Sequence, residues 1–326
     1  MTSPSFLPNA KHGEQLAAKM HGKLVVSLQH LAERIAASTS ETNLGDEIAE
    51  KLLHGKQPLA PSLYLLYQDI VRAALDNDVA TAQILLSEIL KGEWTVDGIE
   101  IRDFSADAMG RGNYARYKNC LNEDPSTPMS LTSPDAETSA SNRRNILDAL
   151  ELMKKGAPDH AAEILPVLSE IVLAKNIDPE QDAFGGASSF SAWGAIFLCS
   201  DNERDQFDLF STLVHETAHL ILFAEAADEP LVLNDPQKKY KSPLRSDLRP
   251  MDGIFHAAFV SARMHHANSC LQNSDISGVN KLPGNLQKNQ ENLKRHFEEG
   301  FTLMKEEAEL TPLGKILLYQ AAEYIL

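Results

Sequence analysis

Residues 209–227 read LFSTLVHETAHLILFAEAA, an apolar run that contains His215, Glu216 and His219 in the order H-E-x-x-H. On a helix, two histidines four residues apart project from one face, one turn above the other, so both imidazoles can reach one metal ion. The flanking side chains are apolar nearly all round, which predicts a buried helix. Buried His and Glu side chains each cost on the order of a few kcal/mol unless they are paired or ligated. The run therefore predicts a metal centre on a buried helix.

The third metal ligand decides the chemistry, because a catalytic metal needs at least three protein ligands and an open position. In the extended metzincin pattern a Gly and a third His follow the motif, but here those places hold Leu222 and Glu225. Thermolysin-like peptidases take a Glu from the following helix. The next predicted helix begins with Asp252 and reaches His256 without any Glu, although Glu225 and Glu229 lie close after the motif. A peptidase of that class would need an unusual ligand.

A long proline-containing segment, residues 230–250, follows the metal helix and carries Tyr240, Arg245 and Arg249. A segment of that length without regular structure is usually functional. A guanidinium donates paired hydrogen bonds to a carboxylate, so the two arginines ahead of His256 predict an anion clamp beside the metal. The alternative is that they form ordinary ion pairs with Asp247 or Asp252.

At these residues the chain resembles the H-E-x-x-H-motif proteins found with ribosomally made peptide natural products. Some members are 2-oxoglutarate-dependent iron enzymes that hydroxylate a peptide at a side-chain β-carbon. The resemblance covers residues 188–264, about a quarter of the chain. It rests on WGAI at 193–196, VHETAHL at 214–220, EPL at 229–231, Tyr240 with Ser242-Pro243, RSDLRP at 245–250 and GIFH at 253–256.

The resemblance implies an Fe(II) centre with open positions for 2-oxoglutarate and O2. Its metal ligands would be His215, His219 and His256. The usual oxygenase arrangement is two His and one carboxylate, so Asp252 and Asp247 are alternative third ligands.

The remaining roles also follow from the resemblance. Arg245 or Arg249 would pair with the distal carboxylate of 2-oxoglutarate, and Tyr240 would add a hydrogen bond. Glu216 would orient a His ligand instead of acting as a base. The expected function is hydroxylation of a precursor peptide by a non-haem iron 2-oxoglutarate-dependent dioxygenase.

Two other functions remain open from the sequence. In a zinc metallopeptidase, Glu216 would be the general base that activates the metal-bound water. In a noncatalytic peptide-binding protein, the helical N-terminal region would hold a leader peptide.

Composition narrows the class of partner. The 326 residues include 46 acidic and 30 basic side chains, a formal charge of -16, which argues against nucleic acid as a partner. A basic peptide partner fits this charge, and so does simple solubility. Three scattered cysteines and the lack of any apolar run of roughly 18 residues predict a cytoplasmic protein outside the membrane. The oligomeric state is not fixed by the sequence.

Hydrophobic spacing predicts a mainly α protein, α+β in detail because of small β elements. We expect a helical, bundle-like body with its metal site on the H-E-x-x-H helix and the helix after it. Helices are predicted at 14–37, 62–76, 79–91, 143–155, 159–175, 209–227, 252–264, 285–308 and 312–325. A hairpin is predicted at 94–101 around Asp97-Gly98, and two short strands within 184–199.

The expected organisation is an N-terminal helical region at 1–121, a loop or linker at 122–142, and a metal-binding catalytic region at 143–326. The polar composition of 122–142 is the basis for the linker. The first and last regions could also pack as one body.

Overall fold

A computed structural model describes residues 4–36, 43–53, 58–123, 129–177, 185–201, 204–242, 247–276 and 284–326, without the side chains of 284–288. The described chain is mainly helical with a small mixed sheet, which confirms the predicted class at that level. It divides into two compact units. Unit 1 comprises residues 1–16, 144–164 and 204–326, and unit 2 comprises residues 17–143 and 165–203.

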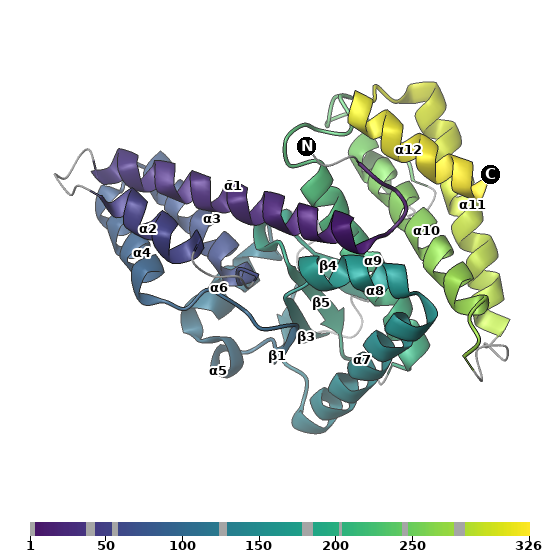
Figure 1. Cartoon of the computed structure of the whole chain (residues 1–326), viewed down its shortest axis with the longest axis horizontal. Helices are drawn as coiled ribbons and strands as arrows, with labels where there is room; N and C mark the ends of the chain where they lie inside the picture. The colour runs from purple at the N-terminus through teal and green to yellow at the C-terminus, as the bar shows by residue number, and fades with distance from the viewer. Residues whose placement is uncertain are drawn as a thin grey trace. The chain divides into compact units, whose positions relative to one another are not determined.

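Unit 1 contains the predicted metal helix, α9 (Gln206–Glu225), and the long helix that follows it, α10 (Met251–Gln272). Figure 1 shows α10 beside α11 (Gly284–Glu307) and α12 (Pro312–Ile325). A short hairpin of β6 (Lys239–Lys241) and β7 (Leu248–Pro250) leads directly into α10. Most of α7 (Ala136–Gly156) and of α8 (Pro158–Val167) also belongs to unit 1.

Local sequence explains where these helices start. The Asp205 side chain accepts hydrogen bonds from the backbone N–H groups of Phe207 and Asp208, which caps α9. Thr311 caps α12 in the same way, and Pro312 occupies the first helical position. Most α9 side chains from Leu209 onward are buried, as the apolar run predicts.

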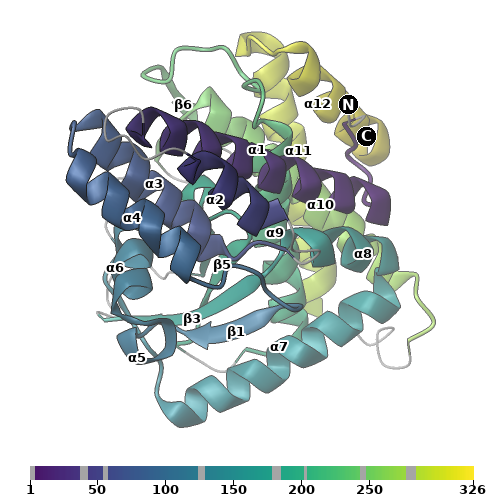
Figure 2. The ribbon, with the colours of Figure 1, turned by 60° about the vertical axis from the view of Figure 1, so that its left-hand side comes forward.

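Unit 2 is built around the sheet, whose strand order is β1-β3-β5-β4, with β2 (Leu131–Thr132) paired to β3. Figure 2 shows β1 (Glu100–Asp103), β3 (Glu170–Asn176) and β5 (Ala195–Cys199) side by side. These three strands are parallel, whereas β4 (Gly186–Ser188) and β2 are antiparallel to their neighbours. The helices of unit 2 are α1 (Ala10–Ala36, from residue 17), α2 (Leu44–Leu53), α3 (Pro61–Leu75), α4 (Val79–Lys91), α5 (Ala106–Met109), α6 (Arg111–Cys120) and the 3-10 turn Phe190–Ala192.

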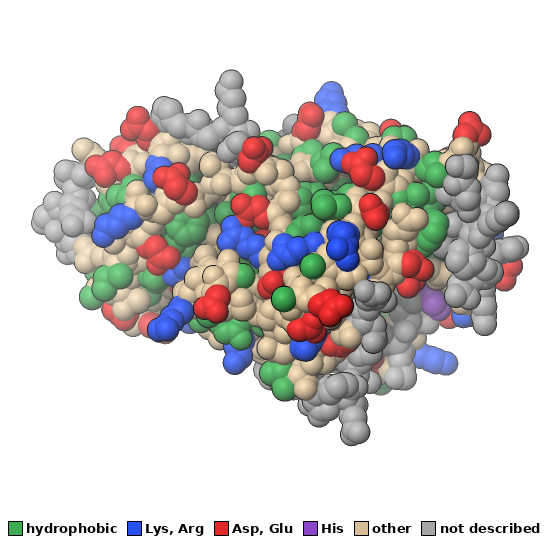
Figure 3. Space-filling view, turned by 90° about the horizontal axis from the view of Figure 1, so that it is seen from below, with side chains coloured by type: hydrophobic (Ala, Val, Ile, Leu, Met, Phe, Trp, Pro, Cys, Tyr) green, Lys and Arg blue, Asp and Glu red, His purple; other side chains and the backbone are tan. Residues whose placement is uncertain are grey.

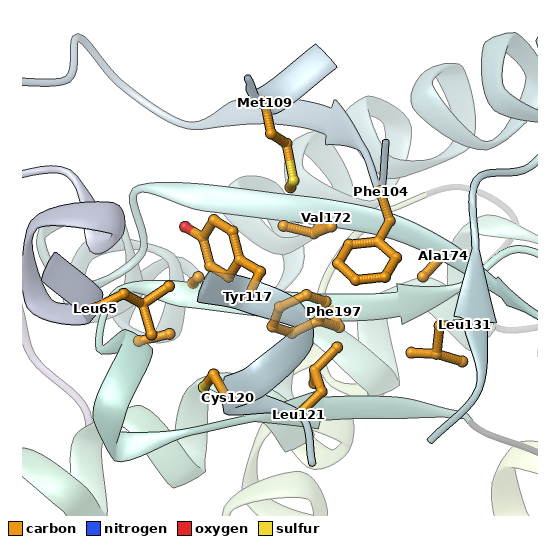
Figure 4. Close-up of a cluster of buried hydrophobic side chains, with 12 residues drawn as sticks. Leu65, Phe104, Met109, Tyr117, Cys120, Leu121, Leu131, Val172, Ala174 and Phe197 are labelled. Atoms are coloured by element: carbon orange, nitrogen blue, oxygen red, sulfur yellow. The ribbon is translucent and has the colours of Figure 1, made fainter. Parts of the chain in front are cut away.

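An aromatic core joins the sheet of unit 2 to α6 (Figure 4). The Phe197 ring meets the rings of Phe104 and Tyr117 edge to face, at centroid distances of 6.0 and 5.6 Å. Such arrangements add stability beyond the buried area alone. The core therefore fixes α6 against β3 and β5.

Most predicted helices are present, but two predictions are wrong. The predicted helix 159–175 is α8 followed by strand β3, because a strand buried on both faces is as continuously apolar as a buried helix. The predicted hairpin at 94–101 does not form. Gly98 has the positive φ of 75° expected of the turn, but Thr95 pairs with Leu59 and β1 pairs with β3.

The segment 122–142 contains regular structure within its described residues. It includes β2 and the first turns of α7, where Asp135 accepts hydrogen bonds from the backbone and side chain of Thr138. The polar residues act here as helix-capping residues. Strands β3, β4 and β5 lie within residues 143–326, the expected catalytic region, but they belong to unit 2.

The described helices were compared with the length and hydropathy that a transmembrane helix requires. None of the described helices is long and apolar enough to cross a bilayer. Figure 3 shows acidic and basic side chains interspersed on the face that it presents. The excess of acidic residues is therefore not gathered into one patch on that face.

We predict that Phe197→Ala destabilises unit 2 by about 3–5 kcal/mol, because the truncation leaves a cavity between two aromatic rings. The exposed Leu75 of the same unit, 77% accessible, provides the control, and Leu75→Ala should cost within about 0.5 kcal/mol. Both tryptophans, Trp94 and Trp193, lie in unit 2, so urea unfolding followed by tryptophan fluorescence reports on this unit. Equal losses in the two variants would contradict this account of the core.

Candidate metal centre

His215 and His219 lie on one face of α9. Their ring centroids are 5.1 Å apart and the ring planes are inclined at 66°. Most of the other helix residues from Leu209 onward are buried, but His215 keeps 38% of its side chain exposed. The pair therefore forms a partly open site on a rigid helix.

His256 of α10 reaches the same pair. Its Nδ1 atom lies 3.0 Å from Nδ1 of His219, and the two rings stack at a centroid distance of 5.3 Å. The Phe223 ring contacts both, with centroids 6.3 Å from His219 and 5.4 Å from His256. Two helices thus bring the three predicted metal ligands into one neighbourhood, with an aromatic ring beside them.

The environment favours the neutral imidazoles that metals bind. Burial lowers the pKa of His215 to about 4. Burial also lowers the pKa of His219 well below its usual value, and the neighbouring histidines add to the effect. For His256, burial lowers the pKa although the charge of Asp252 opposes the shift.

The carboxylates named by the sequence occupy different positions. Glu216 is buried, with its Oε1 atom 3.9 Å from His215 Nε2. Asp252 lies one turn before His256, its Oδ2 atom 3.9 Å from His256 Nε2, with 66% of its side chain exposed. Asp247 lies 2.7 Å from Arg249 Nε in an ion pair. Of the two alternative third ligands, Asp252 is the one beside a histidine.

Tyr240 and Arg249 lie opposite each other in the β6–β7 hairpin. Tyr240 is buried, and its hydroxyl accepts a hydrogen bond from Asn234 at 3.1 Å. Arg249 pairs with Asp247, as the ion-pair alternative predicts, and β7 runs directly into the helix that carries His256. Arg245, the other predicted anion-binding residue, lies outside the described residues.

Three imidazoles are suitable metal ligands, but their side chains do not point toward a common metal position. Across the described ranges of the chain, no group of three or more His, Cys, Asp or Glu side chains is arranged to hold a metal ion. The histidines are adjacent in pairs, His215 with His219 and His219 with His256. Binding one ion through all three would require their side chains to rotate toward a common point.

Unit 1 also contains a buried charge network that the sequence did not reveal. Both ring nitrogens of His12 donate to carboxylates, Nδ1 to Glu163 at 2.7 Å and Nε2 to Glu225 at 2.8 Å. Arg263 forms an ion pair with Glu163 and donates to the Phe6 carbonyl at 2.6 Å. Glu225, which the sequence left open as a metal ligand, is therefore engaged with His12.

The close approach of α1 to α8 makes this network possible. A Cβ atom on Gly13 would lie 2.2 Å from the Glu163 carbonyl oxygen, so glycine is required there. The network joins Glu225 at the end of the metal helix to Arg263 on α10, through Glu163 and His12. It links the two helices that carry the histidines.

Sequence patterns could not reveal this network. Its direct contacts join residues separated by as many as 257 positions, and each polar member alone resembles an ordinary polar residue on a helix. The one local signal is Gly13 within an otherwise helical pattern, because a helix-interior glycine indicates a close packing contact.

We predict that His12 makes stability depend on pH. Burial alone would lower its pKa, but the hydrogen bonds and charges of Glu163 and Glu225 outweigh that effect and raise it from 6.5 to about 9. A raised folded-state pKa stabilises the fold below pH 6.5, and this contribution disappears as the pH rises through about 9. The shift corresponds to about 3 kcal/mol.

Urea unfolding followed by circular dichroism between pH 6 and 10 tests this prediction. His12→Gln should remove most of the decline in the free energy of unfolding. The exposed His30 of the same helix supplies the control, and His30→Gln should retain the decline. An unchanged pH dependence in His12→Gln would rule out a protonated His12 in the folded state.

No protein-family model and no curated protein matches this sequence. A function is therefore inferred from the side chains around His219 together with the sequence resemblance.

Proposed function

We propose that this protein is an Fe(II)- and 2-oxoglutarate-dependent oxygenase that hydroxylates a side-chain β-carbon of a ribosomally made peptide. The observation that carries the proposal is the 3.0 Å contact between His219 of the H-E-x-x-H helix and His256 of the following helix. It supports His256 as the third member of a three-histidine site. The reaction itself is inferred from the sequence resemblance.

The contact places two imidazole nitrogens, one from each helix, 3.0 Å apart. The observed separation of 3.0 Å is that of a hydrogen bond between two imidazoles. This distance supports the proposal only in combination with the residue types, because all three candidate ligands are histidines.

Four further side chains have roles in this function. Glu216 orients His215 from its buried position 3.9 Å away. Arg249, once it exchanges Asp247 for a co-substrate carboxylate, binds 2-oxoglutarate, and Tyr240 opposite it adds a hydroxyl. Phe223 excludes water from His219 and His256. Fe(II), when bound, supplies the activation of O2.

A zinc metallopeptidase is the second candidate, favoured by the position of Glu216. Its carboxylate is buried beside His215, where a general base for metal-bound water would lie. Asp252 would have to act as the third ligand, and 66% of its side chain is exposed. A third candidate is a noncatalytic protein whose helical N-terminal region binds a leader peptide.

We predict that metal binding depends on both helices. Under anaerobic conditions, calorimetric titration should show one Fe(II) per chain, and His219→Ala and His256→Ala should each lower the affinity by more than about tenfold. His30→Gln, which alters an exposed histidine, should leave the affinity unchanged. Adding 2-oxoglutarate to the loaded protein should produce a weak visible absorption band. Undiminished iron affinity in His256→Ala would exclude His256 as a ligand.

Glu216→Gln distinguishes the two enzyme candidates. In the oxygenase, Glu216 only orients a ligand, so the variant should still convert 2-oxoglutarate to succinate without peptide once Fe(II) saturates it. In a zinc peptidase the same variant should keep its metal and lose peptide cleavage completely. Succinate formation and casein cleavage are measured on the same preparations. Cleavage by the zinc-loaded parent that is lost in the variant would overturn the oxygenase proposal.

A further inference from the structure

Unit 2 contains a cavity of about 580 Å³, which is within the size range of small-ligand sites. Its wall is formed by residues of α4 and α6, the start of β3, strand β1 and the segment before β1. None of the histidines of the candidate metal centre lines it. It is a distinct concave site within one unit.

A polar group lies at the floor of this cavity. Glu170 and Tyr117, which are only 6% and 1% exposed, both line it. The Tyr117 hydroxyl donates to Glu170 Oε2 at 2.5 Å. Figure 4 shows that hydroxyl pointing away from the aromatic core, while the ring packs into it. A buried carboxylate held at a cavity floor is a specific recognition group.

The nearby guanidinium groups are already engaged by carboxylates. Arg102 donates to Glu100 at 2.8 Å and lies 3.5 Å from Glu170. Arg116, behind the wall, donates two hydrogen bonds to Glu88, at 2.8 and 2.9 Å. An anionic ligand would have to displace these pairs.

A cationic ligand would share these carboxylates with Arg102 and Arg116, but it would meet a lining with more acidic than basic side chains. The wall contains four carboxylates, those of Glu88, Glu93, Glu100 and Glu170, and two basic side chains, those of Lys91 and Arg102. The lining is therefore net acidic. A carboxylate can accept about four hydrogen bonds, so Glu170 keeps acceptor capacity beyond its bond from Tyr117.

Trp94 adds a second element that favours cations. Its indole N–H donates to the Ile89 carbonyl at 2.9 Å, which fixes the ring in the cavity wall. Guanidinium and ammonium groups are attracted to the faces of indole rings. An aromatic wall together with a buried carboxylate is chemically suited to an alkyl cation.

We propose that this cavity binds a basic side chain of a peptide, with Glu170 as the charge partner and Trp94 as the aromatic wall. A volume of about 580 Å³ admits such a side chain together with neighbouring backbone. The proposal rests on unit 2 alone and does not depend on the metal-centre function. The chain's formal charge of -16 favours approach of a basic peptide.

Calorimetric titration of the metal-free, full-length protein tests the proposal with three matched probes. These are acetyl-Gly-Arg-Gly-amide, the same peptide with Lys, and the same peptide with neutral citrulline. Both cationic peptides should bind at least about tenfold more tightly than the citrulline peptide, because a hydrogen-bonded charge pair is lost. Methylguanidinium, which lacks a peptide backbone, should bind more weakly than the Arg peptide. Equal binding of the Arg and citrulline peptides would overturn the proposal, as would methylguanidinium binding as tightly as the Arg peptide.

Variants and a spectroscopic signal locate the binding. Glu170→Gln should weaken binding of the Arg peptide by about tenfold. Glu151→Gln, on an exposed part of α7, should leave that affinity unchanged. In the parent protein labelled with ¹⁵N-tryptophan, only one of the two indole resonances should shift, and Trp94→Phe should identify it. This measurement does not depend on the folding of Glu170→Gln. Unshifted indole resonances at saturating peptide, or undiminished binding in folded Glu170→Gln, would exclude this cavity.

Discussion

The buried pairing of Glu163 with Arg263 and His12 is the constraint on which unit 1 depends. Glu163 is completely buried, and a carboxylate in that position is costly unless opposite charges offset its desolvation. Burial opposes ionisation, but Arg263 and His12 hold the pKa of Glu163 below its usual value. Removing one partner would leave an uncompensated buried charge, so the segments that carry these residues must pack together.

This constraint reaches the histidines through two helices. Glu225 ends the H-E-x-x-H helix, and Arg263 lies on α10, two turns beyond His256. Because both residues are tied to the same buried cluster, the two helices are held in one register. That register brings His219 and His256 to 3.0 Å. The ion network therefore supports a site to which it contributes no ligand.

The extent to which sequence predicted the structure follows from the range of each interaction. Helices α9, α10 and α12 were predictable because apolar spacing acts within a few residues. Strand β3 was not, because burial on both faces removes any periodicity. The sequence placed His215 and His219 together on one helix. It also named His256 as their partner, and His256 lies 3.0 Å from His219. The pairing of Glu225 with His12, by contrast, depends on tertiary packing that no local pattern specifies. Asp247, the partner of Arg249, lies only two residues away and was named as an alternative from the sequence.

The central claim is that His215, His219 and His256 converge on one metal ion. X-ray absorption at the cobalt edge of anaerobically Co(II)-loaded protein tests it directly, because imidazole rings produce a characteristic multiple-scattering pattern. The account predicts a fit with three imidazoles and oxygen ligands in the remaining positions, reduced to two imidazoles in His256→Ala. A metal bound by oxygen ligands alone, or a spectrum unchanged by that substitution, would contradict it.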